Sequence, residues 1–265
     1  MTLLMILMAP VVAGVGSVWL AAGVSVGVLA RYTQHMLSLA AGALLATGLL
    51  KLLPEAFESG REVHLLFGVL LTGLVFFFLL DKAELWHHGH EHHHDARPGH
   101  AHVHHHGHDS QGSSGGWAVL AGDSLHCFGD GILIAAAFMA DTHLGVVAAL
   151  AVLAHEIPHH MGDLVVLHQG GRSRQTAVIK VSLAGAVTAL GGVVGFYLVD
   201  ALKEQLPLFL VVAASSFIYV ALADLIPQLQ TRLTLRQTLA QVLWLLCGIA
   251  AVLLVGVLTL GGHAH

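Results

Sequence analysis

The amino-acid sequence predicts an all-α membrane protein, a polytopic helical bundle of eight transmembrane helices. The composition supports this in two ways: 56% of the residues are hydrophobic and only 10% are charged, and the mean hydropathy is +0.78. Soluble globular domains carry about 25% charged residues. The third observation is length, because eight apolar stretches approach the ~20 residues that a helix needs to cross a bilayer. They lie at 3–30, 34–54, 63–86, 117–140, 142–168, 174–199, 206–226 and 237–260.

The first three stretches form one predicted unit, residues 1–86. No basic residue precedes Arg31, and no clear small-residue cleavage site follows the first stretch. We therefore expect a first spanning helix rather than a removed signal peptide. The chain has 30 glycines, which often stand beside alanine, as in residues 40–43. Such small residues let transmembrane helices approach each other closely.

A hydrophilic tract at residues 87–116 separates the third stretch from the fourth. It ends in a Gly/Ser-rich run, and nothing in it could form a core, so we expect a disordered loop. Neutral imidazole is a common zinc ligand, so the tract predicts metal binding in several geometries. The alternative is a low-complexity loop without a role in metal binding. Its twelve histidines are His87, His88, His90, His92, His93, His94, His100, His102, His104, His105, His106 and His108.

The distribution of Lys and Arg predicts the orientation of the bundle. With the N-terminus outside, eight basic residues fall on or near the cytoplasmic side and three fall outside, which is the positive-inside bias. Both termini are then extracytoplasmic, and the His-rich loop is cytoplasmic. The eight are Arg31, Lys82, Arg97, Arg172, Arg174, Lys180, Arg232 and Arg236, and the three are Lys51, Arg61 and Lys203.

The remaining unit, residues 117–265, contains the last five predicted helices. A turn at about residues 141–143 joins the fourth stretch to the fifth, so these two helices must be antiparallel neighbours. Counting from that turn, residues 126–130 lie at about the depth of residues 153–157. Both levels fall near the middle of the bilayer.

Metal-ligating residue types recur four residues apart on these two helices, and therefore on one helix face. Ionisable residues at this depth are costly and normally mark a site or a pathway. Imidazole and carboxylate together suit Zn²⁺ or a similar first-row ion. The sequence thus predicts a metal site between the helices, with Asp123, Asp163 and His168 leading toward the cytoplasm. The two strings are His126-Cys127-Phe128-Gly129-Asp130-Gly131 and His155-Glu156-Ile157-Pro158-His159-His160.

Charge and cysteine content exclude other classes. The net charge is −5 and no basic patch is present that could neutralise phosphates, so no nucleic-acid partner is expected. The two cysteines, Cys127 and Cys247, both lie within apolar runs, which argues against a disulfide framework. The expected partners are a divalent metal ion and the lipid bilayer.

The two strings resemble the signatures of the ZIP family of metal transporters. His126 to Gly131 is similar to the His-Asn-x-x-Asp-Gly signature, and His155 to Asp163 is similar to His-Glu-x-Pro-His-Glu-x-Gly-Asp, the form of the LIV-1-like branch. The likeness extends to eight spans in a 3+2+3 arrangement and to the His-rich loop. Proline-containing segments at 52–55 and 219–227 echo one another in oppositely oriented helices, as an inverted repeat would require.

The resemblance implies a transporter, not an enzyme, that moves Zn²⁺ or a related ion (Cd²⁺, Fe²⁺ or Mn²⁺) into the cytoplasm. It also implies a homodimer, movement of spans 1, 4, 5 and 6 against spans 2, 3, 7 and 8, and, for a chain of this size, the bacterial inner (plasma) membrane. The family's metal ligands carry over to His126, Asp130, His155 and His159, with Glu156 as an accessory ligand.

The chain departs from the signatures at two positions. Cys127 replaces an asparagine and offers a softer ligand, which favours Zn²⁺ or Cd²⁺, whereas His160 replaces a glutamate and removes a negative charge. The sixth span supplies no carboxylate, so we expect one main metal site. Together with Asp123, Asp163 and His168, these two residues are accessory or pathway candidates.

An intramembrane zinc metalloprotease is the alternative from another class, because residues 155–159 are literally a His-Glu-x-x-His string. Glu156 would then activate a zinc-bound water, and Asp130 or Asp224 would be the third ligand. Pro158 inside the motif and the surplus ligands His126 and His160 argue against this reading. A metal-sensing membrane protein is the remaining alternative.

Overall fold

The computed structural model describes residues 2–23, 26–89, 114–169, 171, 173–230 and 233–260. Within these ranges the chain is helical without any strand, and eight helices are long and apolar enough to cross a membrane. This confirms the predicted all-α bundle. The eight spans are Leu3–Gly23, Tyr32–Glu58, Val63–Lys82, Leu120–Ala140, Thr142–His168, Arg174–Ala201, Lys203–Leu229 and Leu235–Val257.

Five spans are single α-helices: α5 (Val63–Gly89), α6 (Ser114–Ala140), α7 (Thr142–Gln169), α8 (Arg174–Ala201) and α11 (Leu235–Leu260). The other three contain a π-helical segment. The first span is α1 (Thr2–Val11), η1 (Val12–Gly16) and α2 (Ser17–Gly23); the second is α3 (Val26–Thr47), η2 (Gly48–Leu52) and α4 (Leu53–Glu58); the seventh is η3 (Lys203–Gln205), α9 (Leu206–Tyr219), η4 (Val220–Leu225) and α10 (Ile226–Leu229).

Proline accounts for two of the π-helical segments. Pro54 and Pro227 lack the N–H that would bond the carbonyls of Leu50 and Ala223 four residues earlier, and these carbonyls lie in η2 and η4. The second and seventh spans thus carry the same local distortion. By contrast, α7 continues as an α-helix through Pro158.

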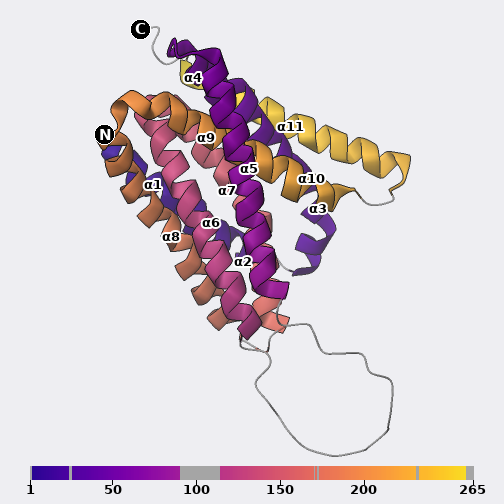
Figure 1. The fold of residues 1–265 in the computed structure, drawn as a ribbon. Helices are drawn as coiled ribbons and strands as arrows, with labels where there is room; N and C mark the ends of the chain where they lie inside the picture. Colours follow the sequence, from indigo (N-terminus) through magenta and orange to yellow (C-terminus); the bar gives the residue numbers. More distant parts are fainter. Residues whose placement is uncertain are drawn as a thin grey trace, which may run out of the picture.

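A one-residue turn holds α6 and α7 together as antiparallel neighbours. Asp141 caps α7, because its Oδ1 accepts the backbone N–H groups of His143 at 2.8 Å and Leu144 at 3.0 Å. At the far end of this pair, α5 ends at Gly89 and α6 begins at Ser114. We call this the loop end of the bundle (Figure 1). Of the predicted loop, residues 90–113 lie outside the described residues.

Close backbone contact at glycines divides the spans into two groups. A Cβ on Gly14 of η1 would overlap the carbonyl of Gly185 on α8, and a Cβ on Gly42 of α3 would overlap that of Leu245 on α11. Every glycine approach of this kind among the described residues joins either two of spans 1, 4, 5 and 6 or two of spans 2, 3, 7 and 8. Small residues therefore pack each group tightly within itself.

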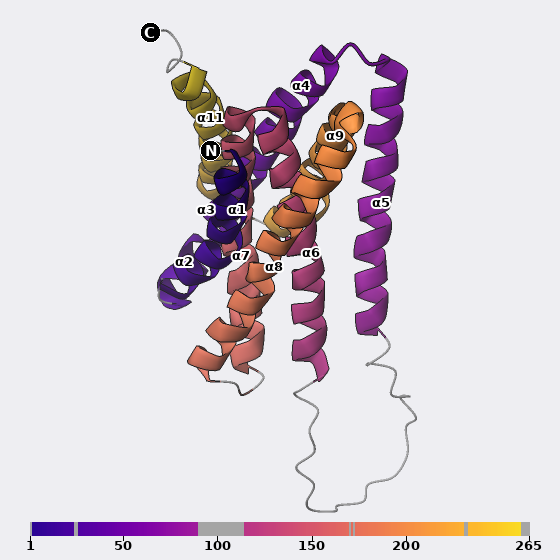
Figure 2. The same cartoon turned by 90° about the vertical axis from the view of Figure 1, so that its left-hand side faces the viewer.

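The outer surface of the bundle is apolar, as lipid contact requires. Leu71 and Phe76 on α5 and Leu239 on α11 are more than half exposed. α5 lies at the edge of the bundle and packs beside α9 (Figure 2). The polar side chains discussed next instead lie between α6 and α7.

Candidate metal centre

Donor side chains from α6 and α7 meet in three neighbouring groups. Within each group, one donor atom per residue lies within 4.8 Å of every other. The primary group is His126, Asp130, His155 and Glu156; the sulfur group is Asp123, Cys127, Glu156 and His160; the loop-end group is Asp123, His159 and Asp163. The turn at Asp141 sets the two helices in register, so the donors of one helix face those of the other.

The primary group has the spacing of a tetrahedral zinc site. His155 Nε2 lies 3.3 Å from His126 Nε2, 3.2 Å from Asp130 Oδ2 and 3.3 Å from Glu156 Oε1. His126 Nε2 lies 3.3 Å from Glu156 Oε1 and 3.8 Å from Asp130 Oδ2. Zinc bonds of 2.0–2.1 Å at tetrahedral angles would place ligand atoms about 3.3–3.4 Å apart. Four donor atoms therefore already surround a point that an ion could occupy.

Hydrogen bonding leaves these atoms available to an ion. His155 Nδ1 lies 3.2 Å from the carbonyl oxygen of Ala151, which can only accept, so Nδ1 carries the proton and Nε2 offers its lone pair. Asp130 Oδ2 and Glu156 Oε1 are buried and have no hydrogen-bond partner. Buried carboxylate oxygens without a partner are costly, and a bound cation would remove that cost.

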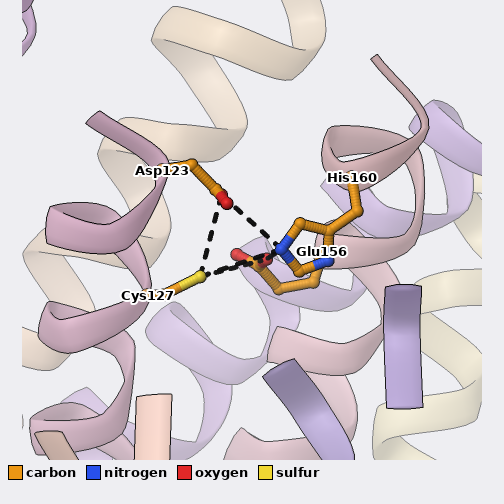
Figure 3. Close-up of side chains that lie close together, drawn as sticks. All are labelled: Asp123, Cys127, Glu156 and His160. Carbon is orange, nitrogen blue, oxygen red and sulfur yellow. Dashed lines mark hydrogen bonds and ion pairs between the residues drawn. The ribbon is translucent and has the colours of Figure 1, made fainter. Parts of the chain in front are cut away.

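The two carboxylate oxygens of Glu156 face different groups. Oε1 faces the primary group, whereas Oε2 lies 3.0 Å from His160 Nε2 and 3.7 Å from Cys127 Sγ in the sulfur group. Figure 3 shows Asp123 and Cys127 on α6 pointing toward Glu156 and His160 on α7. All four side chains of the sulfur group are buried.

The loop-end group lies one to two helical turns nearer the loop end than the primary group. His159 Nδ1 lies 3.5 Å from Asp123 Oδ1, and Asp163 completes the group. The Oδ2 atoms of both carboxylates are buried without a hydrogen-bond partner. His168 is exposed near the end of α7 and belongs to none of the three groups.

A cavity of about 280 Å³ opens beside these groups, between α6, α7, α5 and the seventh span. The carboxylates of Asp81 on α5 and Asp224 on η4 line its far wall, and Tyr219 donates a hydrogen bond to Asp81 Oδ2 at 3.0 Å. Five residues of the three donor groups also line the cavity: Asp123, His126, Asp130, His159 and Asp163. The cavity is an opening beside the primary and loop-end groups, whereas Asp123 is the one residue of the sulfur group that lines it.

The structure brings together His126, Asp130, His155 and Glu156, and it places His159 in the neighbouring loop-end group. The rings of His126 and His159 are 5.3 Å apart at their centroids. His159 lies about 6 Å further along α7 than His155, since an α-helix rises 1.5 Å per residue, and so it faces Asp123 rather than Asp130. The histidines from His90 to His108 lie outside the described residues, and the side chains of His87 and His88 at the end of α5 are not described.

Sequence reasoning missed residues contributed by distant spans. Ser17, at the start of α2, lies with its Oγ 2.8 Å from His160 Nδ1, and Asp81 and Tyr219 line the cavity. A hydroxyl within an apolar span is only a weak signal, because most such groups bond to their own helix. Both oxygens of Glu156 face ligand groups, which favours a ligand role over the general-base role of a protease.

Comparison with known proteins agrees with this geometry. A family model described as ZIP Zinc transporter matches residues 81–256, about two thirds of the chain. The chain is 36% identical over 140 residues to the zinc transporter foi of Drosophila melanogaster. The aligned segment covers 52% of the chain and 20% of that protein.

Two human relatives are similar over shorter segments. The zinc transporter ZIP4 is 37% identical over 111 residues, covering 42% of the chain and 17% of ZIP4, and the zinc transporter ZIP6 is 34% identical over 113 residues, covering 43% and 15%. The matched segment is thus a fifth or less of the length of these three relatives. The chain is an integral membrane protein that belongs to the ZIP zinc transporter family.

Proposed function

We propose that the protein carries Zn²⁺ or a related divalent ion across the membrane through the primary group. One observation carries this proposal: four donor atoms from α6 and α7 converge at tetrahedral spacing inside membrane-spanning helices and beside a cavity that carboxylates and histidines line. The zinc transporters to which the chain is similar support Zn²⁺ as the substrate, and the donor set would also accept Cd²⁺, Fe²⁺ or Mn²⁺.

The donor set suits an ion that must bind and then leave. Asp130 and Glu156 together offset the two charges of a divalent cation, while the histidines replace part of its water shell. The group is open on one side, because His126 and Asp130 line the cavity. An enclosed site of structural type would hold the ion too tightly for transport.

We propose that the loop-end group is the next binding site along the transport path. Asp123, His159 and Asp163 lie between the primary group and the loop end, and all three line the cavity. With the loop end in the cytoplasm, the ion passes from the primary group to Asp123 and Asp163, then past His168 to the His-rich loop. We propose that both termini lie outside, in the bacterial inner (plasma) membrane, as the positive-inside bias of the basic residues supports.

The glycine contacts suggest how access changes sides. Among the described residues, glycines make close contact with a neighbouring span only within spans 1, 4, 5 and 6 or within spans 2, 3, 7 and 8, so small residues pack each group, here called the first and the second unit, tightly. The primary group belongs wholly to the first unit, and the cavity lies between the units. We propose that the first unit moves against the second, and that the second supplies the surface of a homodimer.

Metal flux into proteoliposomes tests the proposal. The purified full-length chain is reconstituted, Zn²⁺, Cd²⁺, Mn²⁺ or Fe²⁺ is added outside, and a chelating fluorophore inside reports entry. His126→Ala and His155→Ala should each abolish Zn²⁺ flux without loss of protein from the vesicles. His64→Ala, which changes an exposed histidine near the start of α5, is the matched control and should transport like the wild type.

The outcomes of this experiment distinguish transport from the alternative functions. Flux that persists in both α6 and α7 histidine variants would place the path elsewhere. Cleavage of added peptides or lipid-embedded helices without flux would favour the metalloprotease, and saturable binding with neither activity would favour a sensor.

A further inference from the structure

We propose that a second cavity, between α3, α7 and α11, binds one acyl chain of a membrane phospholipid, with the ester group of that lipid beside His35. We call it the lateral cavity. None of the residues of the three donor groups lines it. The lipid site does not depend on the proposed function, and only its effect on transport rests on that function.

The lateral cavity is almost entirely apolar. Its volume is about 390 Å³, within the range of about 300–1,000 Å³ that is usual for small-molecule sites. Of its nine lining residues, only Tyr32, His35 and Trp244 carry nitrogen or oxygen atoms in their side chains. The other six are aliphatic side chains or methionine, so the cavity suits a hydrocarbon chain.

The lateral cavity is a gap between two packed layers of the same helices. Toward the loop end, Met36 of α3 and Ile157 of α7 pack against the buried Met161. Toward the opposite end, Ala43 of α3 and Val147 of α7 are buried in one cluster, which α11 completes. Because both layers are close-packed, the helices cannot close the gap by a small shift.

The lateral cavity opens sideways, toward the lipid. Leu150 of α7 and Trp244 of α11 belong to its lining and are also exposed on the surface of the bundle. Tyr32, which is exposed as well, is the first residue of the second span. That end of the cavity therefore lies near the membrane–water boundary, where Tyr and Trp are enriched. Since hydrocarbon is the solvent at this depth, the chain of a neighbouring lipid is the molecule that fills the space.

His35 supplies a polar contact for the lipid. Its Nδ1 is buried and has no hydrogen-bond partner among the described residues, and its ring packs beside Tyr32 and Trp244 at centroid distances of 5.9 and 5.7 Å. A buried nitrogen without a partner is costly. Because no protein group holds Nδ1, the ring can turn an N–H toward a ligand, and an ester carbonyl oxygen accepts such a bond. His35 lies about 4–5 Å further into the span than Tyr32, near the level where headgroups meet hydrocarbon.

The position of the lateral cavity couples its occupant to movement of the first unit. α7 belongs to the first unit, whereas α3 and α11 belong to the second. Leu150, Ala154 and Ile157 share one face of α7, and His155 and His159 share another. Movement of α7 against α3 changes the shape of the cavity, and a lipid stabilises the arrangement that it fits better. A bound chain would thus hold the arrangement seen here and slow the change of access to the metal centre.

Quenching of Trp244 fluorescence tests the lipid site without measuring flux. Trp19, Trp86 and Trp117 of the full-length chain are replaced by phenylalanine, so that Trp244 is the one remaining tryptophan. The purified, delipidated protein in detergent micelles is titrated with a phosphatidylglycerol brominated along one acyl chain, because bromine quenches tryptophan on contact. We expect quenching that saturates at a low mole fraction of this lipid.

A chain that keeps only Trp19 is the control for general contact with the micelle. Trp19 is 63% exposed and Trp244 is 39% exposed, so exposure alone predicts stronger quenching of Trp19. We expect the opposite order at low lipid, with quenching of Trp19 that rises gradually and does not saturate.

Two substitutions in the Trp244-only chain locate the lipid. Ala154→Leu fills the cavity from α7 and should remove the saturable quenching. Ala186→Leu, the same change at an exposed position of α8, is the matched control and should keep it. His35→Leu keeps the lining apolar but removes the polar contact, so it should raise the half-saturating lipid fraction roughly 2- to 10-fold. Circular dichroism and monodisperse gel filtration show that each variant is folded.

Quenching of Trp244 that never saturates, or that is unchanged in folded Ala154→Leu, would overturn the lipid site. Saturable quenching by brominated stearic acid but not by the phospholipid would also overturn it, since the occupant would then be a free fatty acid. Zn²⁺ flux without saturable quenching would remove only the lipid site, and saturable quenching without flux would remove only transport.

Flux also tests the effect of the lipid on transport. Weaker lipid binding in His35→Leu should raise the maximal rate of Zn²⁺ flux in proteoliposomes and leave the half-saturating Zn²⁺ concentration unchanged. An unchanged rate would overturn the coupling between the lateral cavity and the change of access.

Discussion

Gly131 on α6 lies directly against Thr188 on α8: a Cβ on Gly131 would overlap the Thr188 carbonyl oxygen and lie 2.6 Å from the Gly192 nitrogen. Both obstacles are backbone atoms, which cannot rotate away. Because Gly131 follows Asp130 in the chain, this contact holds the Asp130 carboxylate at its depth beside His155. The sixth span contributes no donor atom to the primary group, but its packing against α6 positions the ligand Asp130.

Gly131→Ala should therefore destabilise the fold and weaken zinc binding together. Overpacking of this kind costs about 1–3 kcal/mol, and the added methyl group would push α6 away from α8. Thermal unfolding in detergent and competition for Zn²⁺ with a chromophoric chelator measure the two effects. Gly129→Ala is the control, because a Cβ at Gly129 meets nothing within 4 Å. Equal stability of the two variants would contradict the argument.

Much of this arrangement was predictable from the sequence, for physical reasons that apply to particular residues. The spans follow from the length of the apolar runs, since lipid leaves helices as the only way to pair the backbone. The pairing of His126 and Asp130 with His155 follows from spacing of four residues on helices joined by a turn at Asp141. Both are local properties of the chain.

The rest depends on contacts between distant segments. Ser17 and His160 are 143 residues apart, and only packing of the first span against α7 brings them together. The separation of His159 from the primary group depends on the register of α6 against α7, which a count along the sequence gives only to within a turn. The cavity depends on how α5 and the seventh span pack beside α6 and α7.

Asp163→Asn should slow transport more than it weakens binding. Asp163 belongs to the loop-end group and not to the primary group, so the affinity of the purified chain for Zn²⁺ should change little. Loss of about 1.4 kcal/mol of stabilisation along the path would slow turnover about tenfold. Flux titrations give the maximal rate and the half-saturating concentration separately.

The control for this variant is Asp200→Asn, which removes an exposed carboxylate that pairs with Lys203 at 2.7 Å. It should leave both the rate and the affinity near those of the wild type. A change in affinity alone in Asp163→Asn would show that this carboxylate is a ligand of the primary ion rather than a step on its way out.

Replacing the ten histidines from His90 to His108 with serine should lower the amount of zinc bound but leave flux in place. The tract is low-complexity sequence whose neutral imidazoles are expected to bind zinc weakly and in several geometries, whereas the donors of α6 and α7 are held by helix packing. Substitution keeps the length of the connection between α5 and α6. Equilibrium dialysis measures the bound zinc, and proteoliposomes measure flux. Complete loss of flux would make the tract part of the path.

Cysteine labelling should show that the cavity contains water and on which side of the membrane it opens. Leu80 on α5 lines the cavity, whereas the preceding residue, Leu79, is 57% exposed on the outer surface of the bundle. In a background with Cys127 and Cys247 replaced by serine, Leu80→Cys should react with a membrane-impermeant maleimide and Leu79→Cys should not, because thiols react as thiolates in water.

Reaction should occur in inside-out vesicles and be slow in right-side-out vesicles, since the cavity lies in the loop-end half of the bundle. Zn²⁺ should protect Leu80→Cys if the ion occupies the groups that line the cavity. Equal labelling of both cysteines, or labelling only from outside, would contradict a cytoplasmic opening beside the metal centre.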